Sequence, residues 1–377
     1  MTWPGNPIPV HGELDLSHVV PLPDGWLLAG GLSDSGAAFS DAGWIARTGP
    51  DGRRRWIHRS GSPSDHVQIA HVAPSDDGGA FVGGSRTQRA GESARGFLLE
   101  LDGKGRERWS FEFGGLEVSG VDGLLPSPGG GAVYLRHEYL PTVAHPGRDD
   151  WSGHDFLVGV DAGGSELWRR ELSAAFDRCS VEQLLPHPSG WAALVAASVW
   201  GEGAQDFPLL LTAQAELPQR QSAITEPKAA VGLGAAGSAI LGGVSYTPWG
   251  KRDPVLLRLD AGGRPLWERH YGDPERDRPT CLASTPEGGF VLGGVRGFEG
   301  DHPPPQAVWL IQVDPAGERV YERVFDRGGR DRLAAVAVDA QGRVLAVGDD
   351  WTLSLDAAGE PDPWFRWRGV SLFDPTA

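Results

Sequence analysis

Aspartate followed by a basic residue recurs at the start of repeated segments of this 377-residue chain. The pairs are Asp177-Arg178, Asp277-Arg278 and Asp331-Arg332, and Asp65-His66 stands near the start of an earlier segment. Guanidinium groups bind carboxylates and phosphates through paired hydrogen bonds, so the three arginines and the histidine could together hold an anion. A simpler interpretation is that each arginine neutralises its own or a neighbouring aspartate and so locks adjacent segments. We favour this second interpretation and keep the four residues as candidate ligands.

The densest group of polar and aromatic side chains is the segment from Arg136 to Asp155. It contains four carboxylates together with His137, Tyr139, His145, Trp151 and His154. The histidines are eight and nine residues apart, which matches no standard spacing of zinc ligands. We therefore predict neither a metal nor a cofactor here. We interpret the segment as a solvated loop whose tryptophan packs on its neighbour, with an acid–base site as the alternative.

Aromatic residues also occur in the corresponding loops of other segments, namely Trp200, Tyr246, Trp249, Phe298 and His302. Aromatic side chains at loop tips expose apolar area, which is unusual unless a partner covers it. They predict a shared aromatic binding surface, and the alternative is that they fold down and pack on one another.

Two further histidines and the two cysteines are weaker candidates for a functional role. His18 and His71 occupy matching places on repeated strands and are expected to be structural. Cys179 and Cys281 lie two segments apart, too far for a disulfide, and no nucleophile motif surrounds them.

The strands and turns that must position these residues are easiest to recognise from Thr280 to Phe325. Four short apolar runs are separated there by three turn signals, which is the pattern of a four-stranded antiparallel sheet. Similar copies fill nearly the whole chain, and the fourth is the most degenerate. Each complete copy ends in an aromatic residue, namely Trp56, Trp109, Trp168, Trp267, Tyr321 and Trp364. The spacing from Trp56 to Trp109 is 53 residues, and a period near 50 with four strands per unit predicts a β-propeller.

Each turn has a physical reason. The glycine of Asp-x-x-Gly supplies the positive φ that closes a short hairpin, and the aspartate caps the turn through its side chain. The aromatic residue that follows is expected to fill the wedge between blades near the rim. A calcium loop is excluded, because it needs more oxygen ligands at set spacing.

These turns carry a family resemblance. The stretches Gly-Gly-Phe290-Val-Leu-Gly-Gly and Val-Asp314-x-x-Gly-x-x-x-Tyr321 resemble the repeats of bacterial β-propellers, over roughly residues 13–370. The second stretch is also similar to the tryptophan-docking motif of pyrroloquinoline-quinone propellers, but it has one residue more between Asp and Gly. Those propellers typically have eight blades, so we do not carry the quinone over. The stretch is likewise one residue off the Asp-box of sialidases. The resemblance implies a fold and no particular activity.

We therefore predict an all-β protein, a single seven-bladed β-propeller of four-stranded antiparallel blades. Residues 1–12 form an N-terminal extension, and the propeller covers 13–377. The blades are expected at 13–61, 62–115, 116–174, 175–224, 225–273, 274–327 and 328–377. The last blade is predicted to pack directly on the first, helped by an edge strand near Ile8 to His11.

Function is predicted on one face of this scaffold. The short turns join the first strand to the second and the third to the fourth, so they share a face. The long loops join second to third strands and emerge on the opposite face, where binding is usually placed. The predicted loops are Leu32 to Ala42, Ser85 to Arg95, Arg136 to Asp155, Ser198 to Phe207, Ser245 to Asp253 and Arg296 to Gln306.

Composition narrows the partners. The net charge is −16, from 34 basic and 50 acidic residues, so nucleic acid is not expected as a partner. No apolar run is long enough to span a membrane. Residues 1–10 have neither the basic start nor the apolar core of a signal peptide. We predict a cytoplasmic protein, or a secreted one if a leader has been removed.

Two classes of function stay open, and the sequence does not decide whether the chain is an enzyme. The first is a tryptophan-rich binding or scaffold propeller that recognises a protein, peptide, glycan or small ligand on the long-loop face. Its candidate residues are Tyr139, Trp151, Trp200, Tyr246 and Trp249. The second is a hydrolase or lyase with a polar site at the mouth of the central channel. Its candidates are His66, Arg178, Arg278, Arg332, His137 and His154. We favour binding, because no nucleophile–base pair, phosphate loop or metal spacing is legible.

Overall fold

A computed structural model gives the arrangement of most of the chain. It describes residues 6–7, 13–33, 42–61, 65–87, 93–114, 119–141, 151–172, 178–187, 190–198, 207–212, 216–218, 224, 226–233, 238–246, 252–260, 263–272, 277–296, 307–326, 332–348 and 351–362. These residues form strands, turns and short connections, and no helix occurs among them. Accordingly, the described residues offer no helix with the length and apolar character needed to cross a bilayer.

The strands form seven antiparallel sheets of four strands each. The first sheet consists of β2 (Glu13–Leu22), β3 (Gly25–Ser33), β4 (Ala42–Thr48) and β5 (Arg54–Ser60). The second consists of β6 (His66–Pro74), β7 (Ala80–Thr87), β8 (Arg95–Leu101) and β9 (Glu107–Phe113). The third consists of β10 (Ser119–Pro126), β11 (Ala132–Pro141), β12 (Trp151–Val160) and β13 (Glu166–Glu171).

The remaining sheets follow in chain order. The fourth consists of β14 (Arg178–His187), β15 (Gly190–Ser198), β16 (Phe207–Thr212) and β17 (Glu216–Pro218). The fifth consists of β18 (Glu226–Leu233), β19 (Ser238–Tyr246), β20 (Arg252–Leu259) and β21 (Pro265–His270). The sixth consists of β22 (Arg278–Ser284), β23 (Phe290–Arg296), β24 (Ala307–Val313) and β25 (Arg319–Phe325). The seventh combines β26 (Ala335–Val338), β27 (Val344–Gly348) and β28 (Trp351–Leu355) with β1 (Asn6–Pro7).

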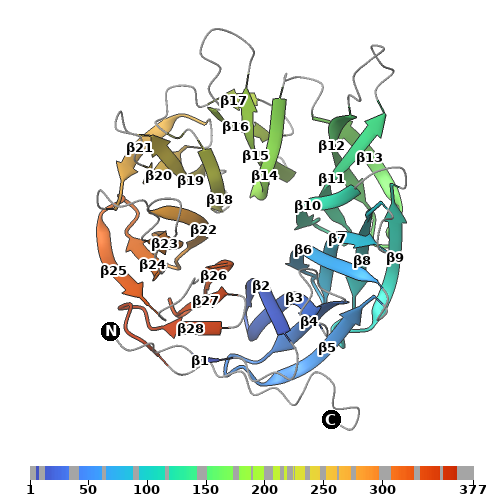
Figure 1. The fold of residues 1–377 in the computed structure, drawn as a ribbon, viewed down its shortest axis with the longest axis horizontal. Coiled ribbons are helices and arrows are strands. Elements are labelled where there is room, and N and C mark those ends of the chain that lie inside the picture. Colours follow the sequence, from blue (N-terminus) through green and yellow to red (C-terminus); the bar gives the residue numbers. More distant parts are fainter. Residues whose placement is uncertain are drawn as a thin grey trace.

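The sheets stand side by side around a ring (Figure 1). The first strand of each sheet lies toward the centre, and each of these inner strands contacts the inner strands of the sheets before and after it. In the first six sheets, this inner strand contains a β-bulge. A bulge inserts one extra residue and bends the strand, which re-aims the side chain at that position. The bulges therefore decide which side chains lie near the middle of the ring.

The seventh sheet is completed by the other end of the chain. Strand β1 pairs antiparallel with β28, with Asn6 opposite Thr352 and Pro7 opposite Trp351. At the far end of β28, Leu355 forms a bridge to Pro361 after the last Asp-x-x-Gly turn. The sequence places the added edge strand at Ile8 to His11, whereas the structure has it at residues 6–7. Residues 8–12 and Trp364 lie outside the described ranges.

The core is divided into clusters, each shared by two neighbouring sheets. Seven such clusters occur among the described residues, and one of them joins the seventh sheet to the first through Leu345, Val347, Leu28 and Trp44. Strand β8 shows how the sequence produces this packing. Its Phe97 and Leu99 are buried against the first sheet, and Leu98 is buried against the third. A strand that is apolar on both faces requires a neighbour on each side, as the runs of β8 and β24 predict.

The turns lock the sheets together at the rim. In the turn Asp161 to Gly164, the Asp161 carboxylate accepts hydrogen bonds from the backbone N–H groups of Gly163 and Ser165, both at 2.9 Å. Gly164 has φ +81° and lies under the ring of Trp109 from the preceding sheet. The indole Nε1 of Trp109 donates to the Ala162 carbonyl at 3.0 Å. The predicted roles of aspartate, glycine and tryptophan are all observed here.

The same contact recurs at other junctions. Trp267 donates to the Pro315 carbonyl at 3.1 Å, and Gly105 and Gly359 pack against Trp56 and Tyr321. The third junction differs, because Trp168 is 39% exposed. The three residues between β16 and β17, at 213–215, include no glycine. Residues 213–215 lie outside the described ranges.

Candidate functional site

Three polar side chains meet near the loop end of the third sheet: His137 on β11, Asp155 on β12 and Asp122 on β10. His137 lies directly opposite Asp155 in the strand pairing. Its Nδ1 is 2.6 Å from an Asp155 carboxylate oxygen. One potential ligand atom from each of the three residues lies within 4.8 Å of the other two. We call this group the His137 centre.

Local structure explains the position of each member. Asp122 is the extra residue of the β10 bulge, between Val121 and Gly123, so its side chain leaves the regular alternation of that strand. Asp155 is 5% exposed, and the buried carboxylate is stabilised by its contact with the imidazole. The His137 side chain is 25% exposed. A molecule at the surface could therefore reach the centre through His137 or Asp122, which are both more exposed than Asp155.

The electrostatics of the centre favour a charged imidazole. The hydrogen bond to Asp155 raises the pKa of His137 above its usual value, against the opposing effect of burial. Burial raises the pKa of Asp122, and the nearby Asp155 carboxylate adds to this effect while His137 opposes it. An imidazole beside carboxylates is an arrangement used both for binding donors and for acid–base chemistry.

A divalent cation would fit this centre only after a change. Two carboxylates and an imidazole are suitable ligands. However, Nδ1 of His137 and a carboxylate oxygen of Asp155 already lie 2.6 Å apart, at hydrogen-bonding distance, so this pair of atoms is not free to bind a cation. A raised pKa also disfavours the neutral imidazole that binds metals. The geometry therefore describes a hydrogen-bonded ion pair rather than a preformed metal site.

His154 does not join this centre. Its Nδ1 lies 2.7 Å from a Glu171 carboxylate oxygen on the outer strand β13, and its ring stacks on Phe156. His154 and Asp155 are adjacent on β12, so their side chains point to opposite faces of the sheet. The segment from Arg136 to Asp155 is also less of a loop than the sequence indicates. Strand β11 continues to Pro141 and β12 begins at Trp151, so His137, Tyr139, Trp151 and His154 all lie on strands.

The predicted residues at the strand starts occupy two different positions. The Arg278 carbonyl lies beside Gly294 and the Arg332 carbonyl lies beside Gly348, so these two arginines are equivalent, and both are exposed. In the second sheet the residue beside the matching Gly84 is Gln68. His66 precedes it by two residues and is partly buried. Arg178 likewise lies three residues before the Val181 at its own bulge, and its side chain is outside the described part.

One predicted aspartate has a partner that the sequence does not indicate. Asp277 is 1% exposed, and its carboxylate accepts hydrogen bonds from Nε and Nη2 of Arg296 at 3.1 and 3.2 Å. Arg296 also donates to Glu322 at 2.5 Å. Asp277 is thus neutralised by Arg296, which lies on the next strand. This ion pair supports the interpretation that the charged residues at the strand starts hold elements together.

His18 and His71 tie the inner strands to one another. His18 Nε2 lies 2.5 Å from the Ala70 carbonyl of the second sheet, and His71 hydrogen-bonds the Asp122 carbonyl of the third. Both accepting carbonyls belong to bulge residues. Burial lowers the pKa of both imidazoles, that of His71 to about 3. These histidines are neutral structural residues, as the sequence predicts. Cys281 is a free thiol whose pKa burial raises to about 12, which leaves it a poor nucleophile.

The aromatic surface remains a prediction. Tyr139, Trp151 and Tyr246 lie at strand ends, but their side chains are not described. His145, Trp200, Trp249, Phe298 and His302 fall outside the described ranges. Sequence reasoning had no means of finding Asp122 as a partner of His137. Asp122 reaches His137 because of the β-bulge in β10, and a β-bulge has no recognisable sequence motif.

Comparisons with known proteins identify the fold. No family model matches the chain, and no curated protein matches it. Solved structures do. A streptogramin B lyase structure aligns over 92% of this chain and 95% of its own, with a TM-score of 0.58 and 12% identity. The β-propeller domain of the Trilobed protease from Pyrococcus furiosus aligns over 95% and 98%, with a TM-score of 0.54 and 11% identity.

A third similar structure is longer than this chain. The acylaminoacyl peptidase of Pyrococcus horikoshii aligns over 93% of this chain but only 52% of its own, with a TM-score of 0.55 and 11% identity. At such identities the likeness establishes the fold alone. Together with the seven antiparallel sheets, it shows that this chain is an all-β protein with a β-propeller fold.

Proposed function

We propose that this chain is a seven-bladed β-propeller that acts as a binding or scaffold protein for a protein, peptide or glycan. The partner lies on the long-loop face. The blades are the seven segments expected from the repeat, at 13–61, 62–115, 116–174, 175–224, 225–273, 274–327 and 328–377, with residues 6–7 added to the last. The observation that carries this proposal is the convergence of His137, Asp155 and Asp122 near the loop ends of three adjacent strands.

The chemistry of this centre defines the partner. Two carboxylates beside one imidazole offer more hydrogen-bond acceptors than donors, so the site suits ammonium, guanidinium or hydroxyl groups. The net charge of −16 attracts a basic partner over longer distances. The proposed contact surface extends from the centre to Tyr139, Trp151, Trp200, Tyr246 and Trp249. The exposed Arg278 and Arg332, with His66 and Arg178, border the same face and would contact acidic groups of the partner.

The test is a binding screen with matched variants. Arrays of peptides and of glycans are probed with the wild-type chain and with the variants His137→Gln and Asp122→Asn. The control is Asp76→Asn, which removes an exposed carboxylate from a turn on the opposite face. We expect the variants at the centre to lose about tenfold or more in affinity for the ligands that the wild type selects, while the control keeps it. Equal affinity of all four proteins would contradict the proposal.

One observation favours a second function, a hydrolase or lyase. Asp155 holds Nδ1 of His137 at 2.6 Å, which fixes the tautomer and orientation of the ring as a carboxylate does for a catalytic histidine. His137 would then exchange a proton with the substrate through Nε2. A panel of esters, lactones and peptides separates the two functions. Turnover that disappears in His137→Gln while substrate affinity persists supports the enzyme, and affinity lost without any turnover supports binding.

A further inference from the structure

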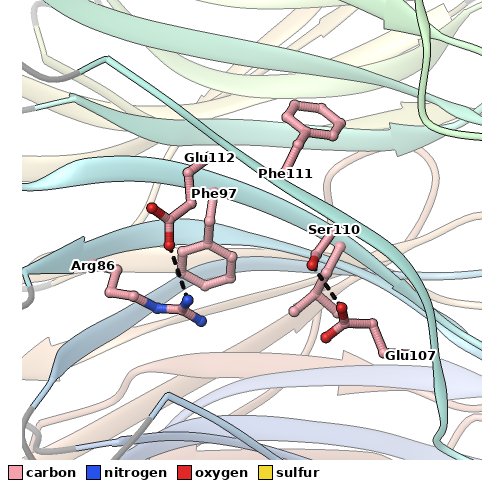
Figure 2. A pocket seen from close by; sticks show the side chains of 7 residues that line it. Arg86, Phe97, Glu107, Ser110, Phe111 and Glu112 are labelled. Atoms are coloured by element: carbon pink, nitrogen blue, oxygen red, sulfur yellow. Dashed lines mark hydrogen bonds and ion pairs between the residues drawn. The ribbon is translucent and has the colours of Figure 1, made fainter.

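A pocket of about 450 Å³ opens on the side of the second sheet that faces the first. It lies on β7, β8 and β9, whereas the His137 centre lies on the next sheet (Figure 2). Its lining residues are Arg86, Phe97, Leu99, Glu107, Ser110, Phe111 and Glu112. A volume of this size is in the usual range for small-molecule sites.

Because the sheets are copies of one repeat, the residues of this pocket can be compared with those at the matching positions of the sixth sheet. In the second sheet, Leu99 is paired with Ser110 and Phe97 with Glu112. In the sixth sheet, Ile311 is paired with Glu322 and Trp309 with Val324 at the matching positions. Arg86 and Arg296 also match, since each stands two residues after the glycine paired with Phe97 or Trp309.

In the sixth sheet, a side chain of the protein itself fills this position. The Glu322 carboxylate accepts a hydrogen bond from Arg296 at 2.5 Å and one from the Trp309 indole N–H at 2.9 Å. Arg319 adds a third donor at 2.8 Å. A carboxylate is thus the group that this kind of slot holds against its arginine.

In the second sheet, the residues that match Glu322 and its neighbours are different, and Arg86 pairs with Glu112 instead. Ser110 replaces Glu322, and the smaller Phe97 replaces Trp309. Val67 is paired with Arg86 and takes the position of Asp277, which bonds Nε of Arg296 in the sixth sheet. As a result, the buried Nε of Arg86 has no hydrogen-bond partner among the described residues.

The other walls restrict what can bind. Phe97 and Leu99 are each 2% exposed and form an apolar floor, with the Arg86 guanidinium 5.3 Å above the Phe97 ring. Arg86 also donates to Glu112 at 2.9 Å and to Ser60 at 3.1 Å. On the other side of the pocket, Ser110 donates to Glu107 at 2.6 Å (Figure 2). One guanidinium and two carboxylates leave the pocket with a net negative charge, so a simple anion would be repelled.

We propose that this pocket binds a small zwitterion with an apolar side chain, a free amino acid such as leucine or phenylalanine. The carboxylate of the ligand accepts from Nη2 of Arg86, as Glu322 accepts from Nη2 of Arg296. Its ammonium group lies between the Glu112 and Glu107 carboxylates. Its side chain covers Phe97 and Leu99. Both charges are needed, because the ammonium offsets the repulsion that the two glutamates exert on the carboxylate.

The test uses isothermal titration calorimetry of the full chain with L-leucine and L-phenylalanine. Hydrocinnamate supplies the carboxylate without the ammonium, and phenethylamine supplies the ammonium without the carboxylate. We expect the amino acids to bind at least about tenfold more tightly than either single-charge compound, as the loss of one charged hydrogen bond implies. Absence of amino-acid binding, or equal binding of hydrocinnamate, would overturn the proposal.

Two variants locate the binding. Ser110→Glu rebuilds the sixth-sheet arrangement and should abolish amino-acid binding while the melting temperature stays at or above that of the wild type. Arg53→Ala is the control, since Arg53 is exposed just before β5 and does not line the pocket. The ¹⁵Nε resonance of Arg86 should also shift on addition of the ligand. Binding that survives in Ser110→Glu would place the ligand elsewhere and refute the assignment.

Discussion

The contact between a tryptophan and the turn of the next sheet can be tested by a single added methyl group. Gly164 has φ +81°, and a Cβ at this position would lie 2.7 Å from the ring of Trp109. The variant Gly164→Ala therefore strains the backbone and pushes the indole away. The adjacent variant Gly163→Ala is a matched control. Gly163 does not have a positive φ, and its Cβ would come no closer than 3.4 Å to Asp161.

The magnitude follows from two separate losses. A non-glycine residue in the left-handed region costs roughly 1–2 kcal/mol. Displacing Trp109 removes the 3.0 Å hydrogen bond from its Nε1 to the Ala162 carbonyl, worth about 1 kcal/mol. We expect Gly164→Ala to lower the free energy of unfolding by about 2–3 kcal/mol in total. Gly163→Ala should be neutral or slightly stabilising, because it reduces the freedom of the unfolded chain.

Urea unfolding measures both variants. Far-ultraviolet circular dichroism follows loss of the sheets, and tryptophan fluorescence follows the environment of Trp109 and the other indoles. Agreement between the two midpoints shows that unfolding is cooperative enough for the comparison. A third variant, Trp109→Phe, keeps an aromatic ring without the donor and should cost about 1 kcal/mol. If the two alanine variants had equal midpoints, the docking of the turn under the indole would not contribute to stability.

Three further predictions concern the His137 centre, the inner strands and the exposed rim. Asp155→Asn should lower the pKa of His137 in an NMR titration, because the hydrogen bond to the carboxylate is what raises it, and an unchanged pKa would assign the shift to other groups. The pKa of His71 falls from 6.5 to about 3 on burial beside His18, so the folded chain resists protonation. The stabilisation that depends on neutral His71 should be fully present above pH 6.5, and the free energy of unfolding should fall as the pH drops toward 3. Urea titrations of His71→Leu should show a smaller fall. Trp168→Ala should cost less stability than the same change at a docked tryptophan, because Trp168 is already 39% exposed, and equal losses in calorimetry would contradict this.

The repeated elements could be predicted because their causes are local. The Asp161 turn needs its own glycine and aspartate, and Trp109 needs only a turn one repeat later, so their spacing is visible in the sequence. Strand β8 shows its burial on both faces through consecutive apolar residues. The fold follows from these signals, since sheets of this kind must stack to be covered.

The site depends on relations that the sequence does not contain. Asp122 reaches His137 because a bulge re-aims it, and bulges have no reliable local signature. Arg296 neutralises Asp277 across two strands, whereas proximity along the chain suggests Arg278. The pocket beside Arg86 becomes legible only when the strand pairing shows that Ser110 stands where the sixth sheet has Glu322. In each of these cases, the contact depends on strand pairing between residues that are distant in the sequence.

The pairing of β1 with β28 sets an order of events during synthesis. Asn6 is synthesised before the first six sheets, but its partner Thr352 is synthesised after all of them. The first six sheets can form as they emerge, because each is contiguous in the chain. Until β28 has formed and paired with β1, the residues Trp351 and Leu353, which are buried in the folded protein, lack their neighbouring strand. The two ends of the incomplete ring can then pair with other nascent chains. Slow translation of the segment that contains β28, or a bulky insertion beside β1, should therefore increase aggregation more than the same change within the first six sheets.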